Sequence, residues 1–130
     1  MLAVLGQAAG GHDRPRMADL LSAVDELCKR EGLKVPSRAS VYKLLAILPT
    51  PVLRVADLPQ AVHDALYNLT GESQVPAHQV AFYCFNYGDL AAMSFAAGLP
   101  WLALYQAGRV PGFRPRSRGL FEAVARARGV

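Results

Sequence analysis

Residues 31–45 read EGLKVPSRASVYKLL and contain the predicted end of one helix and the start of another. Gly32 can adopt the left-handed backbone conformation that commonly ends a helix, and Leu33 can then fold back onto the last turn. Ser37 offers a side-chain oxygen to the free backbone N–H groups of a following helix. Pro49 stops that second helix, because proline lacks a backbone N–H. The stretch therefore predicts two helices joined by a short connection.

Each of the two predicted helices, which lie within residues 15–31 and 37–48, has an apolar side. In the first, apolar residues recur at spacings of three and four, the period of an amphipathic helix. They are Met17, Leu20, Leu21, Val24, Leu27 and Cys28. In the second, a turn of 100° per residue separates Val41, Leu44, Leu45 and Leu48 from Arg38, Ala39, Tyr42 and Lys43. We expect the two apolar sides to pack together.

Residues 17–48 resemble the helix-turn-helix of bacterial regulators and of related recombinase or transposase DNA-binding domains. The resemblance rests on Gly32-Leu33 followed by Pro36-Ser37-Arg38-Ala39-Ser40-Val41-Tyr42, and it covers about a quarter of the chain. In that family the second helix enters the major groove, and its N-terminal residues meet base edges. The resemblance implies a double-stranded DNA partner. It also implies that DNA is contacted by Ser37, Arg38, Ala39, Tyr42 and Lys43.

The connection between the two helices differs from that of the family. It has six residues, from Glu31 to Pro36, whereas the turn of the motif has about three or four. An ordinary helical hairpin with a solvated outer face is therefore the alternative interpretation of residues 17–48. We place DNA binding first because the outer face of the second helix has the right chemistry for it.

The remaining sequence predicts further short helices and little or no β-structure. Residues Met1–Ala9 predict a helix. Four more helices are expected where apolar residues recur at helical spacing between a proline or aspartate that can begin a helix and a glycine that can end it. They begin at Pro59, at Ala77, at Asp89 as an N-cap and at Pro100. Residues 52–55 are the only good strand candidate. Because they have no evident hairpin partner, we expect an extended connector or a rudimentary wing.

The C-terminal segment, residues 109–130, alternates arginine with proline and glycine up to Gly119 and then predicts a short helix. We expect a mobile, positive tail that contacts phosphates, with a merely solvated basic terminus as the alternative. The whole chain predicts an all-α single domain of about six or seven short helices. Its expected parts are residues 1–14, a helix-turn-helix-like unit at 15–49, a helical core at 50–108 and the arginine-rich segment at 109–130.

Charge is distributed unevenly along the chain. The net charge is +4, with +3 in residues 1–54, −4 in residues 55–108 and +5 in residues 109–130. This pattern suggests a polyanionic partner. Further cations that we expect to contact DNA are Lys34, Arg54, Arg114, Arg116 and Arg118. If the basic residues act together, they should share one face of the molecule.

The aromatic helical hairpin of residues 82–105 supports an alternative function. Its second helix contains Trp101, Leu102 and Tyr105 but no Lys or Arg, so it is unsuited to binding the phosphates of DNA. We expect these residues to pack in the core. The alternative is that the hairpin is a homodimer or partner surface, as in an antitoxin-like or adaptor subunit.

Other classes of function have little support in the sequence. The three histidines share no metal-ligand spacing with the cysteines, so we expect no metal and no cofactor. No nucleophile can be matched with a base, so we do not expect an enzyme. Cys28 and Cys84 lie in apolar helical patterns, which indicates buried thiols and a cytoplasmic location. The apolar residues 75–108 are interrupted too often to span a membrane.

Overall fold

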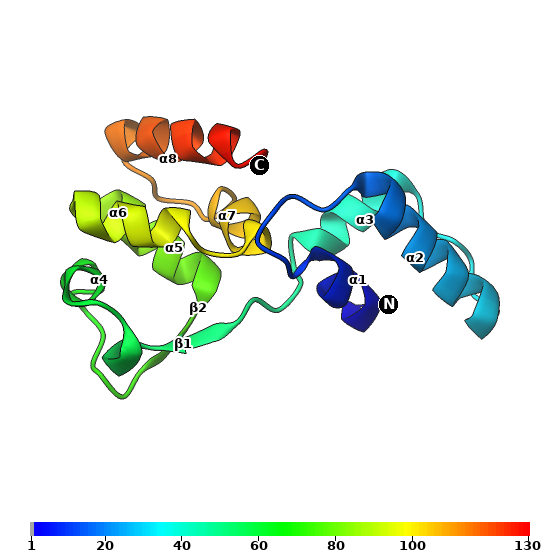
Figure 1. Ribbon diagram of the computed structural model, residues 1–130, viewed down its shortest axis with the longest axis horizontal. Coiled ribbons are helices and arrows are strands. Elements are labelled where there is room, and N and C mark those ends of the chain that lie inside the picture. The colour runs from blue at the N-terminus through cyan, green and yellow to red at the C-terminus, as the bar shows by residue number, and fades with distance from the viewer. Residues whose placement is uncertain (1) are drawn as a thin grey trace.

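The computed structural model describes residues 2–130, and within them the chain forms eight α-helices, one 3-10 helix and two short strands (Figure 1). Their bounds are α1 Leu2–Ala9, α2 Met17–Glu31, α3 Arg38–Leu45, β1 Val52–Arg54, η1 Val55–Asp57, α4 Gln60–Ala65, β2 Gln74–Pro76, α5 Ala77–Tyr87, α6 Leu90–Ala97, α7 Trp101–Ala107 and α8 Pro115–Ala127. The mostly helical architecture confirms the predicted class, although the helices exceed the six or seven expected and a small sheet is present. Figure 1 shows α1–α3 as a smaller group of helices beside a larger group, α4–α8.

The smaller group has its own hydrophobic cluster. Helix α1 packs against both α2 and α3, and Leu5 at its centre is fully buried. Leu20, Val24 and Cys28 of α2 share one hydrophobic cluster with residues of α3 and of the turn that follows it. The two apolar sides are thus buried in the same core, although the backbones of both helices approach α1 more closely than they approach each other. The residues contributed by α3 and its following turn are Val41, Leu45 and Leu48.

The end of α2 confirms one local prediction and corrects another. Gly32 adopts the left-handed conformation with φ of 68°, and the Leu33 N–H donates to the Cys28 carbonyl at 2.8 Å. These backbone features form the expected helix terminus. The Leu33 side chain, however, is 56% exposed, so it does not fold back onto the helix as predicted. The hydrogen bonds alone are sufficient to end the helix here.

The larger group is organised around α5, which packs against α4, α6, α7 and α8. Its buried residues include Val80, Cys84 and Phe85, and Phe85 meets Phe121 of α8 with ring centroids 5.3 Å apart. Asp89 caps α6 as predicted, because its Oδ1 accepts a hydrogen bond from the Ala92 N–H at 2.9 Å. The start of α6 is thus fixed by a short-range hydrogen bond, whereas α5 is held by contacts with distant residues.

Helix α7 belongs to both hydrophobic clusters, and all seven of its residues are buried. Trp101, Leu102 and Tyr105 pack with α1–α3, whereas Ala103, Leu104 and Ala107 pack with α5 and its neighbours. This placement confirms core packing for the uncharged aromatic helix. It also makes α7 the element that joins the two groups of helices.

The strand prediction was wrong in one respect, because β1 has a partner. It pairs with β2 in an antiparallel two-stranded sheet, with Leu53 opposite Val75. The partner strand has only three residues, ends in Pro76, and lies beyond the intervening helix α4. Proline at the end of a short edge strand is tolerated, but it conceals the strand in a sequence pattern.

The C-terminal segment also differs from the prediction. Helix α8 begins at Pro115 and continues through Gly119, where we expected an irregular, mobile stretch. Phe113 stacks on Phe121 with ring centroids 5.1 Å apart, and this aromatic pair anchors the segment on the core. Tertiary packing therefore outweighs the cost of glycine inside a helix, which is about 1 kcal/mol. By contrast, α3 ends earlier than expected, at Leu45.

Candidate nucleic-acid interface

Helix α3 and the loop before it present five of the ten residues that the sequence assigned to DNA as exposed side chains. Arg38, Ala39 and Lys43 are exposed on α3, and Lys34 is exposed in the loop before it. Ser37 is the N-cap, and its Oγ accepts a hydrogen bond from the Ser40 N–H at 3.2 Å. Tyr42 is half-buried and packs against the cluster of α1–α3, so it contributes less to this surface than predicted.

The positive charges of this surface have no acidic neighbours in sequence. Residues 32–56 contain no Asp or Glu. Within residues 2–130, the ion pairs that form do not include Lys34, Arg38 or Lys43. On α2, by contrast, the Lys29 ammonium lies 2.9 Å from Asp25, and this carboxylate raises the pKa of Lys29. The cations of α3 and its preceding loop are therefore available to an external anion.

Arg54 does not share this surface, contrary to the expectation that the basic residues occupy one face. It lies in β1 and forms an ion pair with Asp57 at 3.4 Å. In Figure 1, β1 lies at the lower edge of the view, whereas α8 lies along the upper edge. The pairing of β1 with β2 holds Arg54 in the small sheet, opposite Gln74.

The other predicted arginines lie at the beginning of α8. Arg114 is the N-cap residue, and its guanidinium stacks over the Tyr87 ring, 4.7 Å from the centroid. Arg116 is exposed, and Arg118 forms an ion pair with Glu122 at 3.3 Å. They are ordered on a helix rather than carried on a mobile tail. Helix α8 can therefore present positive charge in a fixed direction.

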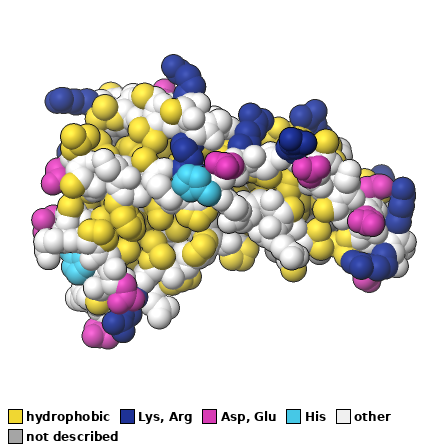
Figure 2. Space-filling model, viewed as in Figure 1, with side chains coloured by type: hydrophobic (Ala, Val, Ile, Leu, Met, Phe, Trp, Pro, Cys, Tyr) yellow, Lys and Arg dark blue, Asp and Glu magenta, His cyan; other side chains and the backbone are white. Residues whose placement is uncertain are grey.

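Basic residues that the sequence analysis did not single out connect α8 with the α1–α3 group. Arg14 and Arg16 are exposed in the loop before α2, and the Arg14 side chain lies beside Gly129. Arg128 donates hydrogen bonds to the carbonyls of Ala97 and His12, which ties the chain end to the same loop. Figure 2 shows Lys and Arg side chains along the upper edge of the molecule over both groups of helices. The charge surpluses of residues 1–54 and 109–130 were the available signals for these arginines.

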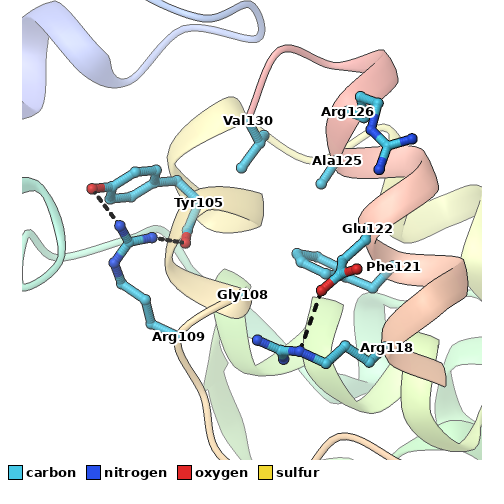
Figure 3. Close-up of a pocket in the computed structure, with 9 residues that line it drawn as sticks. All are labelled: Tyr105, Gly108, Arg109, Arg118, Phe121, Glu122, Ala125, Arg126 and Val130. Carbon is cyan, nitrogen blue, oxygen red and sulfur yellow. Dashed lines mark hydrogen bonds and ion pairs between the residues drawn. The ribbon is translucent and has the colours of Figure 1, made fainter. Parts of the chain in front are cut away.

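A pocket of about 390 Å³ lies between α7 and α8 (Figure 3). Its lining includes three arginines, one from the end of α7 and two from α8. They are Arg109, Arg118 and Arg126. Glu122 and the buried rings of Tyr105 and Phe121 complete most of the wall. This pocket joins cations that the sequence places up to seventeen positions apart.

Two cysteines and one histidine are wholly or partly buried. Cys28 and Cys84 are buried free thiols, as predicted, and burial together with the charge of Asp89 raises the pKa of Cys84 to about 12. His78 lies 3.0 Å from the Thr50 hydroxyl, and burial lowers its pKa below 6.5. In the part of the chain that the structure describes, no three His, Cys, Asp or Glu side chains gather as a metal site.

No helix among residues 2–130 is long and apolar enough to cross a membrane. Comparisons of the chain with protein-family models, with curated proteins and with solved structures gave no match.

Proposed function

We propose that the protein binds double-stranded DNA, with α3 as the helix that enters the major groove. The observation that carries the proposal is the exposed outer face of α3, where Arg38, Ala39 and Lys43 face solvent without an acidic partner while the opposite face is buried. Arginine can donate two hydrogen bonds to guanine, and a small residue beside it allows close approach to the bases. The proposed role is a small transcriptional regulator or a DNA-binding accessory protein.

The basic residues of α8 support a second, sequence-independent contact. In Figure 1, α8 lies along the upper edge of the larger group and α3 lies in the upper part of the smaller group. The Arg14 side chain, from the α1–α2 loop, lies beside Gly129, just after α8. Lysine and arginine that neutralise phosphates release counterions, so they add affinity without reading sequence. We assign Arg114, Arg116 and Lys34 to this role and remove Arg54 from it.

Fluorescence anisotropy with a labelled random-sequence duplex tests the proposal. Affinity should fall steeply between about 50 mM and about 200 mM salt, because each phosphate contact contributes about 0.9 to the log–log slope. The double variant Arg38→Gln/Lys43→Gln should lower that slope by up to about 1.8 and weaken binding at every salt concentration.

The matched control is Lys29→Gln/Arg54→Gln, which also removes one lysine and one arginine. Both control residues are already paired with aspartates, and neither lies on the proposed surface. The control should bind DNA nearly as well as the wild type. Equal losses in the two double variants would show that overall charge, and not α3, governs binding. If the wild type did not bind DNA at low salt, the proposal would be refuted.

A homodimer is a second candidate for the exposed part of residues 82–105. Helix α6 contains no charged residue, and Leu90 at its start is 79% exposed, which is unusual for a large apolar side chain. A dimer would present two copies of α3 to two half-sites on DNA. Light scattering on wild type and on Leu90→Ser tests this: the wild type should have twice the monomer mass, and the variant should be monomeric. A monomeric wild type would exclude the dimer.

A further inference from the structure

We propose that the pocket between α7 and α8 binds a small organic anion, with Arg118 as the cation that extends across the pocket and Arg109 and Arg126 as further positive charges of its lining (Figure 3). This site is separate from the outer face of α3 and does not depend on DNA binding. Its volume of about 390 Å³ lies within the usual range for small-molecule pockets, which is about 300–1,000 Å³. The ligand is a carboxylate or a phosphate monoester with a small aromatic or aliphatic body.

Arg109 is held in position without the help of a carboxylate. Its Nη1 donates to the Tyr105 carbonyl at 3.0 Å and its Nη2 to the Tyr105 hydroxyl at 2.7 Å. The guanidinium carbon also lies 3.7 Å from the centroid of the Tyr105 ring. These contacts restrict the side chain while its positive charge remains uncompensated. A cation that is already ordered loses less entropy when it binds an anion.

Arg118 enters the pocket from the opposite wall. Its Nε pairs with Glu122 Oε1 at 3.3 Å, so the carboxylate occupies one edge of the guanidinium. Figure 3 shows the side chain extending from α8 toward Gly108 and α7. Within residues 2–130, neither terminal nitrogen of Arg118 has a hydrogen-bond partner, which leaves both as donors for an oxyanion. Two such donors match the geometry of a carboxylate or a phosphate.

The charge balance of the lining favours an anion. The lining includes three guanidinium groups and one carboxylate, that of Glu122. Glu122 is the only acidic residue between Leu90 and Val130 in the sequence. Cations clustered in a cleft raise the local concentration of anions. The positive charge of this lining contrasts with residues 55–108, which have a net charge of −4.

The floor of the pocket is apolar, which is why we infer an organic ligand and not a bare inorganic ion. Tyr105, Phe121 and Ala125 are buried residues that line it. A Cβ on Gly108 would lie 3.1 Å from the Phe121 ring, so glycine lets the end of α7 approach α8 closely. An apolar group on the ligand would bury surface against this floor, and hydrophobic burial would add to the charge interaction.

NMR titration of the ¹⁵N-labelled protein with four probes tests the proposal. The probes are phenyl phosphate, benzoate, inorganic phosphate and the neutral benzyl alcohol. Phenyl phosphate or benzoate should shift the Gly108 amide and its neighbours in a saturable manner, and whichever binds more tightly identifies the anionic group. Inorganic phosphate should bind at least about tenfold more weakly, and benzyl alcohol should not saturate. No saturable shift with either aromatic anion would overturn the proposal.

Variants of exposed arginines make the test specific. Arg118→Gln and Arg126→Gln should each weaken binding of the aromatic anion by about tenfold, because each removes a charged donor from the pocket. Arg116→Gln is the control, since Arg116 lies on the same helix outside the pocket. Equal weakening by all three variants would overturn the proposal. So would shifts at Gly108 that only duplex DNA produces, because the pocket would then belong to the nucleic-acid surface.

Discussion

Replacement of Gln106 should destabilise the protein more than any exposed substitution of similar size. Gln106 is 5% exposed, and its Nε2 donates to the carbonyls of Leu45 at 3.0 Å and of Leu48 at 2.6 Å. The last carbonyls of a helix lack partners within the helix. Here the residue four positions after Leu45 is Pro49, which has no N–H to donate. Gln106 supplies the missing donor from α7.

The magnitude follows from the two carbonyls that lose their donor. In Gln106→Leu the side chain keeps a similar volume, so the main loss is hydrogen bonding and not packing. A buried polar group without a partner costs about 1–3 kcal/mol. We therefore expect the free energy of unfolding to fall by about 2–4 kcal/mol, allowing for some relaxation of the chain around Leu48. Urea denaturation followed by circular dichroism measures this change, with an unchanged m value.

Gln7→Leu is the matched control, because Gln7 is exposed on α1. It should change the free energy of unfolding by less than about 0.5 kcal/mol. If Gln106→Leu were equally mild, the reasoning would be refuted, since the carbonyls of Leu45 and Leu48 would then have to find other donors. A lowered m value would instead show that the two groups of helices unfold separately.

Two further predictions concern a helix cap and a histidine. Asp89→Ala should lower the free energy of unfolding by about 1 kcal/mol, whereas Asp89→Asn should keep most of the cap; thermal denaturation compares them. Because burial lowers the pKa of His78, the unfolded chain binds its proton more readily, and stability should fall as the pH drops through about 6.5. Unfolding measured from about pH 7.5 to about 5.5 should show this loss in wild type and a smaller one in His78→Gln.

Features that depend on neighbouring residues could be predicted from the sequence. The cap at Ser37, the cap at Asp89 and the left-handed Gly32 each involve hydrogen bonds across three to five positions. The outward direction of Arg38 and Lys43 likewise follows from the helical period once the apolar side is known. These local rules gave most helix boundaries within a few residues.

Features that depend on distant residues could not be predicted in the same way. The pairing of β1 with β2 joins segments about twenty positions apart, and the partner strand shows no alternating pattern. Arg128 resembled other arginines of a basic tail, yet it binds the carbonyls of Ala97 and His12. The pocket of Arg109 and Arg118 exists only because α8 packs beside α7. In each case the partner is chosen by tertiary packing, which a local pattern does not contain.

Helix α7 determines how the two basic elements are placed relative to each other. Its Gln106 holds the C-terminal end of α3, while the Trp101 indole donates to the Gly129 carbonyl just beyond α8. A single buried helix therefore fixes both α3 and the end of α8. If α3 and α8 contact the same duplex, loosening α7 should weaken DNA binding although no side chain of α7 faces the DNA. Gln106→Leu should then lose affinity in the anisotropy titration while retaining the salt slope, because the phosphate-binding side chains are unchanged. A lower slope in that variant would mean that the charged surface itself had been disrupted.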